Sequence, residues 1–375
     1  MYILEVSRGC PNEKYPLYGI FEMDQAKALK SAGHKVIFAA VDVRSVRRRR
    51  RFGIFKTIKD GITVYNFSFP VGAIRGADKA FARWGFEQLM KRIIAEYGKP
   101  DIVHAHFSGM AACVRQCCIK ENIPYVVTEH SSSVNKEELP DKFKAELCES
   151  YKNAAAVVAV SEALREKIEK HTGVKAQVIP NIVDFSAFKT FNRSENKMRF
   201  LSAGNLKESK GFDVLIRAFA KVHEKRPDSK LLIMGGGSEE DMLRKLAEEE
   251  NLADVVEFSG AFQREDFAKE LKESDVFVLA SRSETFGVVY AEAMAAGRPV
   301  IATRCGGPED FVNEKCGKLV DVDDVAALSK TMLEVGECSS EFDSSYISSY
   351  VRSRFSADTI AAHLSALFSS VISKA

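Results

Sequence analysis

Two glutamates, Glu284 and Glu292, stand eight positions apart in the stretch SRSETFGVVYAEAMAAG. Between them, the Thr-Phe-Gly sequence is typical of a turn, and Gly287 is predicted to mark the start of a helix. Glu284 then precedes the helix, whereas Glu292 lies about 7–8 Å along it, at ~1.5 Å per residue.

The spacing of these two carboxylates suits one kind of chemistry. The first turn of a helix has free amides that bind phosphate groups. Carboxylates repel phosphate and are suited to the hydroxyl groups of sugars. The stretch therefore has the dimensions to bind a sugar, a diphosphate and a nucleoside together, although two glutamates near a helix start are also typical of an ordinary soluble surface.

A second stretch whose residues could bind a ligand is GNLKESKG, Gly204–Gly211, which precedes a predicted helix beginning near Phe212. It is not an ATP-binding P-loop, because Ser209 stands where the motif needs its second glycine and Gly211 where it needs Ser or Thr. Lys210, at the helix entry, is well placed to contact a phosphate, since the helix dipole favours negative charge there. A solvated loop lysine is the alternative interpretation.

The composition, 46% hydrophobic and 28% charged over 375 residues, is that of a globular protein of about two domains. A formal net charge of +2 argues against nucleic acid as the main partner. The eight cysteines show no zinc-type spacing, so we expect reduced thiols and no metal site. We find no apolar run of the ~18 residues that cross a bilayer and no signal-peptide pattern in MYILEVSRGC, and therefore expect a cytoplasmic protein.

Short apolar runs alternate with longer amphipathic runs along the chain. The first series of strands is YILEV, KVIFAAV, DIVHAH, PYVVTEH, AAVVAVS and AQVIP, and the second is RFLSAG, KLLIMGGG, VVEFSG, VFVLAS and PVIAT. Strands separated by helical patterns such as IFEMDQAKALKSAG predict βαβ units and parallel sheets. The turn GGGSEE lacks the third glycine of a dinucleotide motif, so a tight turn and a weak phosphate contact remain open.

The two series predict an α/β protein with two Rossmann-like domains, residues 1–183 and 184–355, whose parallel sheets face each other across a cleft. The segment VIPNIVDFSAFKTFNRSENK between them has the polar composition of a linker. Ligands of such sheets bind beyond the carboxyl ends of the strands, so the cleft is the predicted site. Residues 356–375 predict a helix with an apolar stripe, for which the first domain is a candidate surface.

One segment, RSVRRRRRFG, concentrates positive charge in Arg44 and Arg47–Arg51. Two interpretations are open. The run is either a solvated basic loop or a patch for anionic lipid head groups, with Phe52, Ile54 and Phe55 in the membrane interface. The second interpretation would make the protein peripheral on the inner face of the membrane.

The stretch SETFGVVYAEAMAAGRPVIATRCGGPEDFV closely resembles the signature of retaining GT-B glycosyltransferases, in particular the large GT4 family. GNLKESKGFDVLIRAFA is similar to the phosphate-binding segment of that family, VIPNIVDFSAF to its interdomain segment, and DIVHAHF and VVTEHSS to its first-domain strands. The resemblance covers most of the chain. It implies transfer of a sugar from a nucleoside diphosphate sugar to an acceptor with retained anomeric configuration, without a bound metal or other cofactor.

The resemblance also implies a role for each matching residue. Glu292 would bind the ribose hydroxyls, Glu284 would face the hydroxyls of the donor sugar, and Lys210 would neutralise the leaving phosphate. His130, in TEH, would line the donor sugar and the acceptor. The remaining donor-site residues that match the family are Gly19, Thr285, Phe286, Gly287 and Val288.

The chain departs from the family pattern at Asn205, where the family usually has an arginine beside the phosphates. Asparagine carries no charge, so a bidentate cationic contact is lost, and Lys207 is the candidate replacement. Ile182 replaces the glycine of the interdomain motif. UDP is favoured over GDP as the nucleotide, and the expected acceptor is a glycan or a lipid-linked oligosaccharide in cell-surface polysaccharide assembly.

Three alternatives remain open. A glycogen phosphorylase-like enzyme would share the fold but needs a lysine that binds pyridoxal phosphate, and no segment of the sequence indicates such a lysine. A glycosidase would use two glutamates as acid and nucleophile. A non-catalytic, membrane-associated protein that binds sugar nucleotides would use the arginine run.

Overall fold

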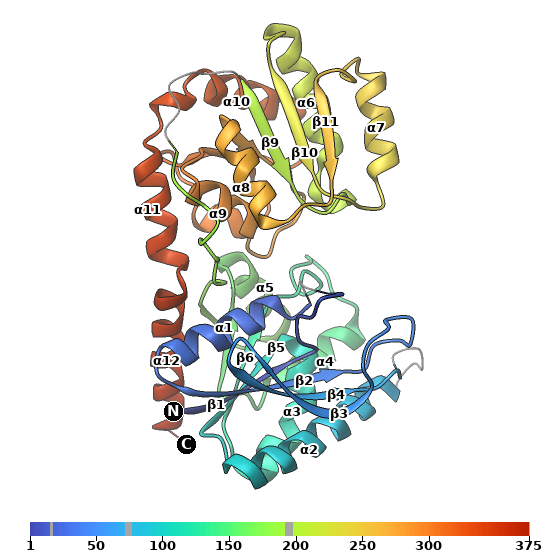
Figure 1. The fold of residues 1–375 in the computed structure, drawn as a ribbon, viewed down its shortest axis with the longest axis vertical. Helices are drawn as coiled ribbons and strands as arrows, with labels where there is room; N and C mark the ends of the chain where they lie inside the picture. Colours follow the sequence, from blue (N-terminus) through green and yellow to red (C-terminus); the bar gives the residue numbers. More distant parts are fainter. Residues whose placement is uncertain (16–17, 72–76, 192–197, 375) are drawn as a thin grey trace. The chain divides into compact units, whose positions relative to one another are not determined.

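The computed structural model describes residues 1–15, 18–71, 77–191 and 198–374. The chain divides into two compact units, Met1–Ile182 with Ala357–Ala375 and Val183–Ser356. Each unit has helices packed on a sheet (Figure 1). The tract at residues 192–197, which the sequence assigns to the linker, lies outside the described residues, as do Pro16 and Leu17 of YPLYGIF.

The N-terminal unit has a sheet with the strand order β3-β4-β2-β1-β5-β6-β7-β8 in its described part. Neighbouring strands are parallel, except that β3 runs antiparallel to β4. The strands are β1 (Tyr2–Ser7), β2 (Lys35–Asp42), β3 (Gly53–Lys59), β4 (Ile62–Ser68), β5 (Ile102–His106), β6 (Tyr125–Glu129), β7 (Ala156–Ala159) and β8 (Gln177–Val178).

The β3–β4 hairpin was not predicted from the sequence, which assigned this region to a basic loop and its flank. Lys59 pairs with Ile62, and the two residues between them, Asp60 and Gly61, have φ angles of 49° and 73°. An Asp-Gly pair favours this two-residue turn because both positions need positive φ. The Asp-Gly sequence was therefore a usable hairpin signal, and β3 is an edge strand.

Helices cover both faces of the N-terminal sheet (Figure 1). Helix α1 packs on β1 and β2 beside α12, whereas α2 packs on β2 and β4 and α3 packs on β5 and β6. The helices are α1 (Ile20–Ser31), α2 (Ala77–Tyr97), α3 (Phe107–Glu121), α4 (Asp141–Tyr151), α5 (Glu162–Thr172) and α12 (Ala357–Ile372).

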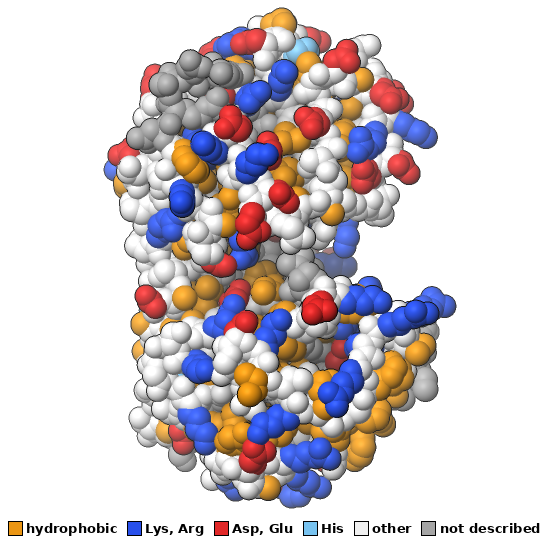
Figure 2. Space-filling view, in the orientation of Figure 1, with side chains coloured by type: hydrophobic (Ala, Val, Ile, Leu, Met, Phe, Trp, Pro, Cys, Tyr) orange, Lys and Arg blue, Asp and Glu red, His pale blue; other side chains and the backbone are white. Residues whose placement is uncertain are grey.

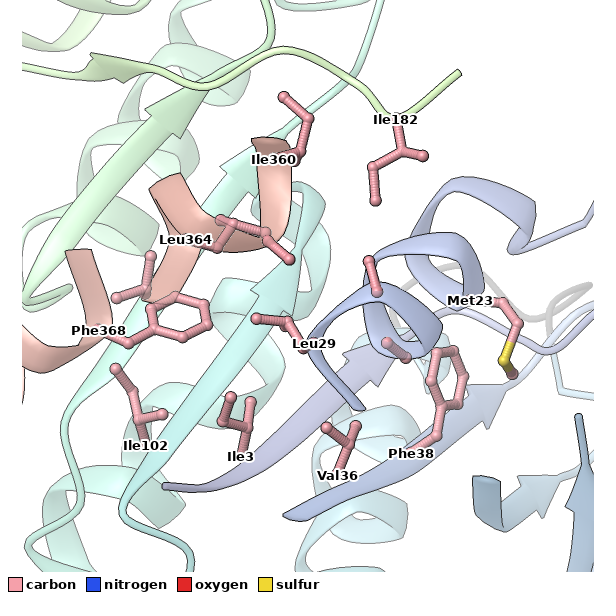
Figure 3. Packing of buried hydrophobic residues seen from close by; sticks show 14 of the residues in the cluster. Ile3, Met23, Leu29, Val36, Phe38, Ile102, Ile182, Ile360, Leu364 and Phe368 are labelled. Atoms are coloured by element: carbon pink, nitrogen blue, oxygen red, sulfur yellow. The ribbon is translucent and has the colours of Figure 1, made fainter. Parts of the chain in front are cut away.

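Helix α12 supplies part of the core of the N-terminal unit. Ile360, Leu364 and Phe368 repeat every four residues, so they lie on one face of the helix, and none of them is exposed. Figure 3 shows these side chains in the same hydrophobic core as Ile3 and Ile102. The last helix of the chain therefore completes a core whose other members come from the first half of the sequence.

Helices α11 and α12 together, Ser344–Ile372, are long and apolar enough by length and composition to cross a bilayer. The expectation that the chain has no such segment is therefore wrong. A core helix of a soluble protein passes the same test, and the apolar face of α12 is buried in the N-terminal unit. The segment by itself assigns no membrane span.

The C-terminal unit has a parallel sheet with the order β11-β10-β9-β12-β13-β14. Its strands are β9 (Arg199–Ala203), β10 (Lys230–Met234), β11 (Val256–Gly260), β12 (Val276–Val278), β13 (Val300–Thr303) and β14 (Gly317–Val320). Its helices are α6 (Phe212–Lys225), α7 (Glu240–Glu249), α8 (Arg264–Glu273), α9 (Val288–Ala295), α10 (Val325–Glu337) and α11 (Ser344–Phe355). The strand order reverses between β9 and β12, which is where ligands bind in open α/β sheets.

We predict that Phe368→Ala destabilises the N-terminal unit by about 3–5 kcal/mol, because it leaves a cavity in a core where the ring has no exposed surface. Urea unfolding followed by the fluorescence of Trp84, the single tryptophan, reports on this unit. His363→Ala, at an exposed position on the same helix, is the matched control and should change stability by less than about 0.5 kcal/mol. Equal effects of the two variants would contradict a core role for α12.

Candidate active site

The loops that follow β9 and β12 meet at the point where the strand order reverses. The N–H of Arg282 donates to the carbonyl oxygen of Ser209 at 2.9 Å. Gly211 has a φ of 61°, and a Cβ at this position would lie 1.9 Å from the carbonyl oxygen of Ala280. A side chain is thus excluded at Gly211 by both conformation and space, and the two loops form one compact structure.

An ion pair joins the two loops. Nζ of Lys210 lies 2.5 Å from Oε1 of Glu284, and the hydroxyl of Ser281 donates to the same oxygen at 2.9 Å. The side chains are 24% and 10% exposed, respectively. The sequence predicts separate roles for the lysine and the glutamate, and the structure adds that they are direct neighbours. A phosphate that contacts Lys210 therefore has to share it with Glu284.

The backbone around Glu284 is held by the loop that follows β13. The N–H of Glu284 donates to Cys305 at 3.1 Å, and its carbonyl oxygen accepts from the N–H of Gly307 at 3.1 Å. A Cβ at Gly307 would lie 2.3 Å from Cα of Phe286, so glycine permits this close approach. The ring of Phe286 is buried beside Phe311, which leaves its backbone as the part able to face a ligand.

Gly287 sets the start of α9. Its φ of 93° is in the left-handed region, and a Cβ here would lie 2.8 Å from the ring of Tyr290. Thr285 and Val288, on either side of the Phe-Gly pair, are half-buried. The helix therefore begins where the sequence predicts, directly after the turn that carries Glu284, and its first amides are those of the predicted diphosphate site.

Glu292 lies inside α9 and forms an ion pair that was not predicted. Nε of Arg264 lies 3.0 Å from Oε1 of Glu292, and NH1 of Arg264 lies 2.8 Å from Oδ2 of Asp184. Burial raises the pKa of Glu292 to about 7, and Arg264 opposes that rise. A sugar hydroxyl that binds Glu292 would therefore meet a carboxyl group with a guanidinium already beside it.

The loop containing Asn205 and Lys207 rests on the triple-glycine turn. The N–H of Leu206 donates to Gly236 at 3.1 Å, and a Cβ at Gly235 would lie 1.9 Å from the carbonyl oxygen of Gly204. Asn205 and Lys207 are both exposed on this anchored loop. Glycine at position 235 thus permits a close approach between two backbone segments, as expected of a tight turn.

In the N-terminal unit, Gly19 precedes α1 with a φ of 81°. A Cβ at Gly19 would lie 2.6 Å from the carbonyl oxygen of Gly9, in the loop that follows β1. A side chain at position 19 would therefore collide with the loop that follows β1, so glycine permits this close approach.

His130 is buried directly after β6. Its Nε2 lies 3.1 Å from Nδ1 of His106, and its Nδ1 lies 2.9 Å from Oδ1 of Asn181. Phe21 stacks on the ring at 6.2 Å, and Phe107 lies at 5.1 Å. Burial lowers the pKa of His130 well below its ordinary value, so the ring is neutral at pH 7. Both ring nitrogens already have protein partners.

Comparison with known families accounts for both units. Residues 184–349 match the model of glycosyl transferases group 1, and residues 23–187 match the model of glycosyltransferase family 4. The chain belongs to glycosyltransferase family 4. A D-inositol 3-phosphate glycosyltransferase of Pseudarthrobacter chlorophenolicus is 30% identical over 262 residues, which are 63% of this chain and 61% of that protein. The match thus spans less than two thirds of that family 4 relative.

Solved structures confirm the predicted fold of this family 4 protein. Sucrose-phosphate synthase from Thermosynechococcus elongatus has a TM-score of 0.80 at 22% identity, over 100% of this chain and 99% of that one. The Anabaena protein HepE, solved in complex with UDP, has a TM-score of 0.76 at 19% identity, over 99% of this chain and 100% of that one. Both units are Rossmann-like, as in other GT-B proteins.

Sequence reasoning missed a buried polar cluster in the N-terminal unit of the family 4 protein. Glu5, His104, His106 and Thr128 are fully buried, and Glu5 and His104 are cross-strand partners on β1 and β5. A signal was present: within otherwise apolar strands, polar residues recur at every second position in DIVHAH, which places them on one face.

A second missed residue is Glu129, which is also fully buried. Its carboxylate accepts hydrogen bonds from the backbone N–H groups of Ser108, His130 and Ser131 at 2.9, 3.0 and 2.8 Å, and from the hydroxyl of Tyr151 at 2.7 Å. One acid thus ties together the start of α3, the loop after β6 and α4. This holds the backbone of His130 in place.

We predict that Glu292→Gln flattens the pH dependence of stability of the C-terminal unit. Because the folded carboxyl has a pKa of about 7 against an ordinary 4.5, the folded state holds the extra proton between these values. Its contribution is therefore full at low pH and is lost as the pH rises through about 7, by on the order of 3 kcal/mol.

Calorimetry at about pH 5 and pH 8 measures this difference in the wild type and the variant. Glu249→Gln, an exposed glutamate of the same unit, is the control and should retain the wild-type pH dependence. An unchanged pH dependence in Glu292→Gln would mean that Glu292 is not the group responsible.

Proposed function

We propose that this protein transfers a sugar from a nucleoside diphosphate sugar, UDP in preference to GDP, to a glycan or lipid-linked acceptor, with retention of configuration and without a bound metal. Membership of glycosyltransferase family 4 supports the reaction class. The observation that carries the proposal is the contact of Lys210 with Glu284 beside the start of α9. A cation and free helix amides can bind a phosphate, and an acid beside them can accept hydrogen bonds from the hydroxyl groups of a sugar linked to that phosphate.

Each part of the donor then has a partner of suitable chemistry. The backbone amides at Gly287 and Val288 hold the diphosphate, since free amides and the dipole of a helix start favour anions. Glu292 accepts from the ribose hydroxyls, in competition with Arg264. Glu284 accepts from the donor sugar, and it also keeps Lys210 in position next to the diphosphate.

The reaction breaks the bond between the anomeric carbon and a phosphate oxygen, and negative charge builds on the leaving diphosphate. Lys210 and the amides at the start of α9 stabilise this charge without moving, because both are held by the surrounding loops. Lys207 supplies the further cation that the family places at the position of Asn205. The acceptor attacks the face from which the diphosphate leaves, and its proton passes to the leaving phosphate.

The preference for UDP rests on likeness to HepE, whose structure contains UDP. A thermal-shift panel of UDP and GDP sugars tests the preference, because ligand binding raises apparent stability by RT ln(1 + [L]/Kd). The same panel separates the alternatives. A glycosidase would hydrolyse glycosides without a nucleotide sugar, and a phosphorylase-like enzyme would show pyridoxal absorbance.

We predict that Lys210→Ala lowers kcat for sugar transfer by roughly 10²–10³-fold, since it removes the side-chain cation from the leaving group. Transfer from the preferred nucleotide sugar, measured by release of nucleoside diphosphate, gives the rate. Lys221→Ala, an exposed lysine on α6, removes the same charge from the same unit and should retain the wild-type rate. Undiminished transfer by Lys210→Ala would refute the mechanism.

We also propose that the arginine run contacts an anionic membrane surface. Arg50 is not part of the contact, because its guanidinium binds Asp42 at 2.7 Å and the carbonyl oxygens of its own loop. Arg47, Arg48, Arg49 and Arg51 are exposed. In Figure 2, Lys and Arg side chains gather on the right-hand edge of the N-terminal unit, where Figure 1 draws the loop between β2 and β3.

Exposed apolar side chains accompany these arginines. Val46 and Phe52, at either end of the run, are 59% and 42% exposed, and Trp84 on α2 is 45% exposed. Gly53, next to Phe52, pairs with Ser68 at the end of β4, and Phe67 on β4 lies 5.6 Å from Trp84. Cationic and apolar groups on one edge are the combination that binds anionic lipid surfaces.

We predict that replacing Arg47, Arg48, Arg49 and Arg51 with Ala abolishes co-sedimentation with vesicles containing phosphatidylserine, at about 1 kcal/mol per lost contact. A variant with Ala at Lys120, Lys142, Lys144 and Lys152, four exposed lysines of the same unit, has the same net charge and should still bind. Binding that survives the arginine replacements, or falls equally in both variants, would exclude this surface as the membrane contact.

A further inference from the structure

One face of the N-terminal sheet changes from apolar to polar along its strands. Ile3 is followed on the same face of β1 by Glu5, and Ile102 is followed on β5 by His104 and His106. The isoleucines lie in the core with α1 and α12, whereas the polar residues lie toward the carboxyl ends of the strands. All three polar side chains are without solvent exposure.

These residues form a continuous chain of hydrogen bonds with His130. Oε2 of Glu5 lies 2.8 Å from Nε2 of His106, whose Nδ1 lies 3.1 Å from Nε2 of His130. Nδ1 of His130 lies 2.9 Å from Oδ1 of Asn181. His104 is a side branch of this chain, because its Nδ1 lies 3.1 Å from Oε1 of Glu5. All of these distances between donor and acceptor atoms are those of hydrogen bonds.

The number of protons that this series of hydrogen bonds needs follows from the groups in it. Its two ends, the carboxylate of Glu5 and Oδ1 of Asn181, can only accept hydrogen bonds. Three contacts join the four groups, and each contact needs one proton on a ring nitrogen. Two neutral imidazoles carry only two protons between them, so one of the two rings must be an imidazolium.

The surroundings decide which ring carries the charge. Burial lowers the pKa of His130 well below its ordinary value and also lowers the pKa of His104, so both are neutral at pH 7. Burial raises the pKa of Glu5, but its contacts with the two histidines of β5 outweigh that and hold it at about 2. The carboxylate is therefore ionised, and the ring that balances its charge is the one at 2.8 Å, His106.

Other groups around this series of hydrogen bonds are consistent with a charged His106 and a neutral His104 and His130. A carboxylate accepts, so Nδ1 of the neutral His104 ring donates to Glu5, and its Nε2 then accepts from the hydroxyl of Thr128 on β6 at 2.7 Å. The positive charge of Arg8, in the loop after β1, disfavours a second cation at His130. Phe368 on α12 and Phe21 on α1 cover the rings with apolar surface. Glu129 is on the opposite face of β6.

We propose that Glu5 and His106 form a buried carboxylate–imidazolium pair that positions His130, fixing its proton on Nδ1 toward Asn181 and its lone pair toward His106. Glu5 and His106 are then positioning residues, because they act on a substrate only through His130. His130 cannot act as a general base in this arrangement, since its one lone pair accepts from His106. The role of His130 beside the sugar rests on the proposed function, whereas the charge of His106 does not.

The test is nitrogen NMR of the full chain labelled with ¹⁵N-histidine, which distinguishes an imidazolium from each neutral tautomer. From the hydrogen-bond geometry we expect His106 to carry protons on both nitrogens and His130 to carry one on Nδ1. Signals are assigned by their loss in the His106→Gln and His130→Gln variants.

Glu5→Gln should remove one of the two ring protons of His106, because the compensating carboxylate is gone. Glu22→Gln is the matched control: Glu22 is buried in the same unit and accepts from the hydroxyl of Ser7 at 2.8 Å, so His106 should keep both protons. A neutral His106 in the wild type, or an unchanged imidazolium in Glu5→Gln, overturns the proposal. If Glu5→Gln does not fold, the wild-type spectrum alone decides.

Kinetics provide the second readout. Glu5→Gln should lower kcat for transfer by roughly ten- to a hundred-fold, since a misplaced group beside the reacting sugar is costly. Its affinity for UDP should be unchanged, because the predicted nucleotide contacts other than Gly19 are in the C-terminal unit. A kcat equal to that of the wild type overturns the positioning role. Absence of transfer by the wild type would instead refute the proposed function and leave the NMR result standing.

Discussion

The ion pair between Lys210 and Glu284 is the interaction on which the candidate site of the C-terminal unit depends. Its members come from loops after neighbouring parallel strands, and those loops are locked by a backbone hydrogen bond and by the absence of a side chain at Gly211. The backbone positions of the pair are therefore fixed by the fold of the two loops. A phosphate and a sugar hydroxyl that arrive together can each replace one half of this contact, whereas a ligand with only one of these groups leaves the other half unsatisfied.

The buried acids of the two units are stabilised in different ways. Glu284 has a lysine and Glu292 an arginine, whereas Glu129 has three backbone amides and a tyrosine hydroxyl. Among the described residues, the hydrogen-bond partners of the Glu5 carboxylate are the imidazoles of His104 and His106, and in our proposal one of these rings carries the compensating charge. An unpaired buried charge costs several kcal/mol, so each acid also fixes the elements that carry its partner. The partners connect loops and strands that are distant in sequence, and this is how polar groups contribute to the geometry of both sites.

The sequence was informative where the signal is local. The strand and helix alternation, the helix start at Gly287 and the position of Lys210 all follow from short patterns, and the family resemblance and the GT-B fold are confirmed. Contacts that depend on the register between strands could not be predicted from the sequence. Glu5 and His104 are separated by 99 positions, and nothing in either stretch indicates that they pair. The contact of Arg264 with Glu292 was not predicted either, because it depends on how α8 and α9 pack in the folded unit.

The position of α12 has a consequence for how the protein is made. Residues 183–356 form their own unit, and the helix that follows them returns to the core built by residues 1–182. During synthesis α12 is made only after residues 183–356, so the N-terminal unit acquires the buried contacts of α12 after the inserted unit has been translated. Until then, the sheet face that carries Ile3 and Ile102 lacks the part of its cover that α12 supplies, although α1 is already present. The nascent N-terminal half should therefore expose apolar surface throughout translation of the inserted unit, which makes it a natural client for chaperones.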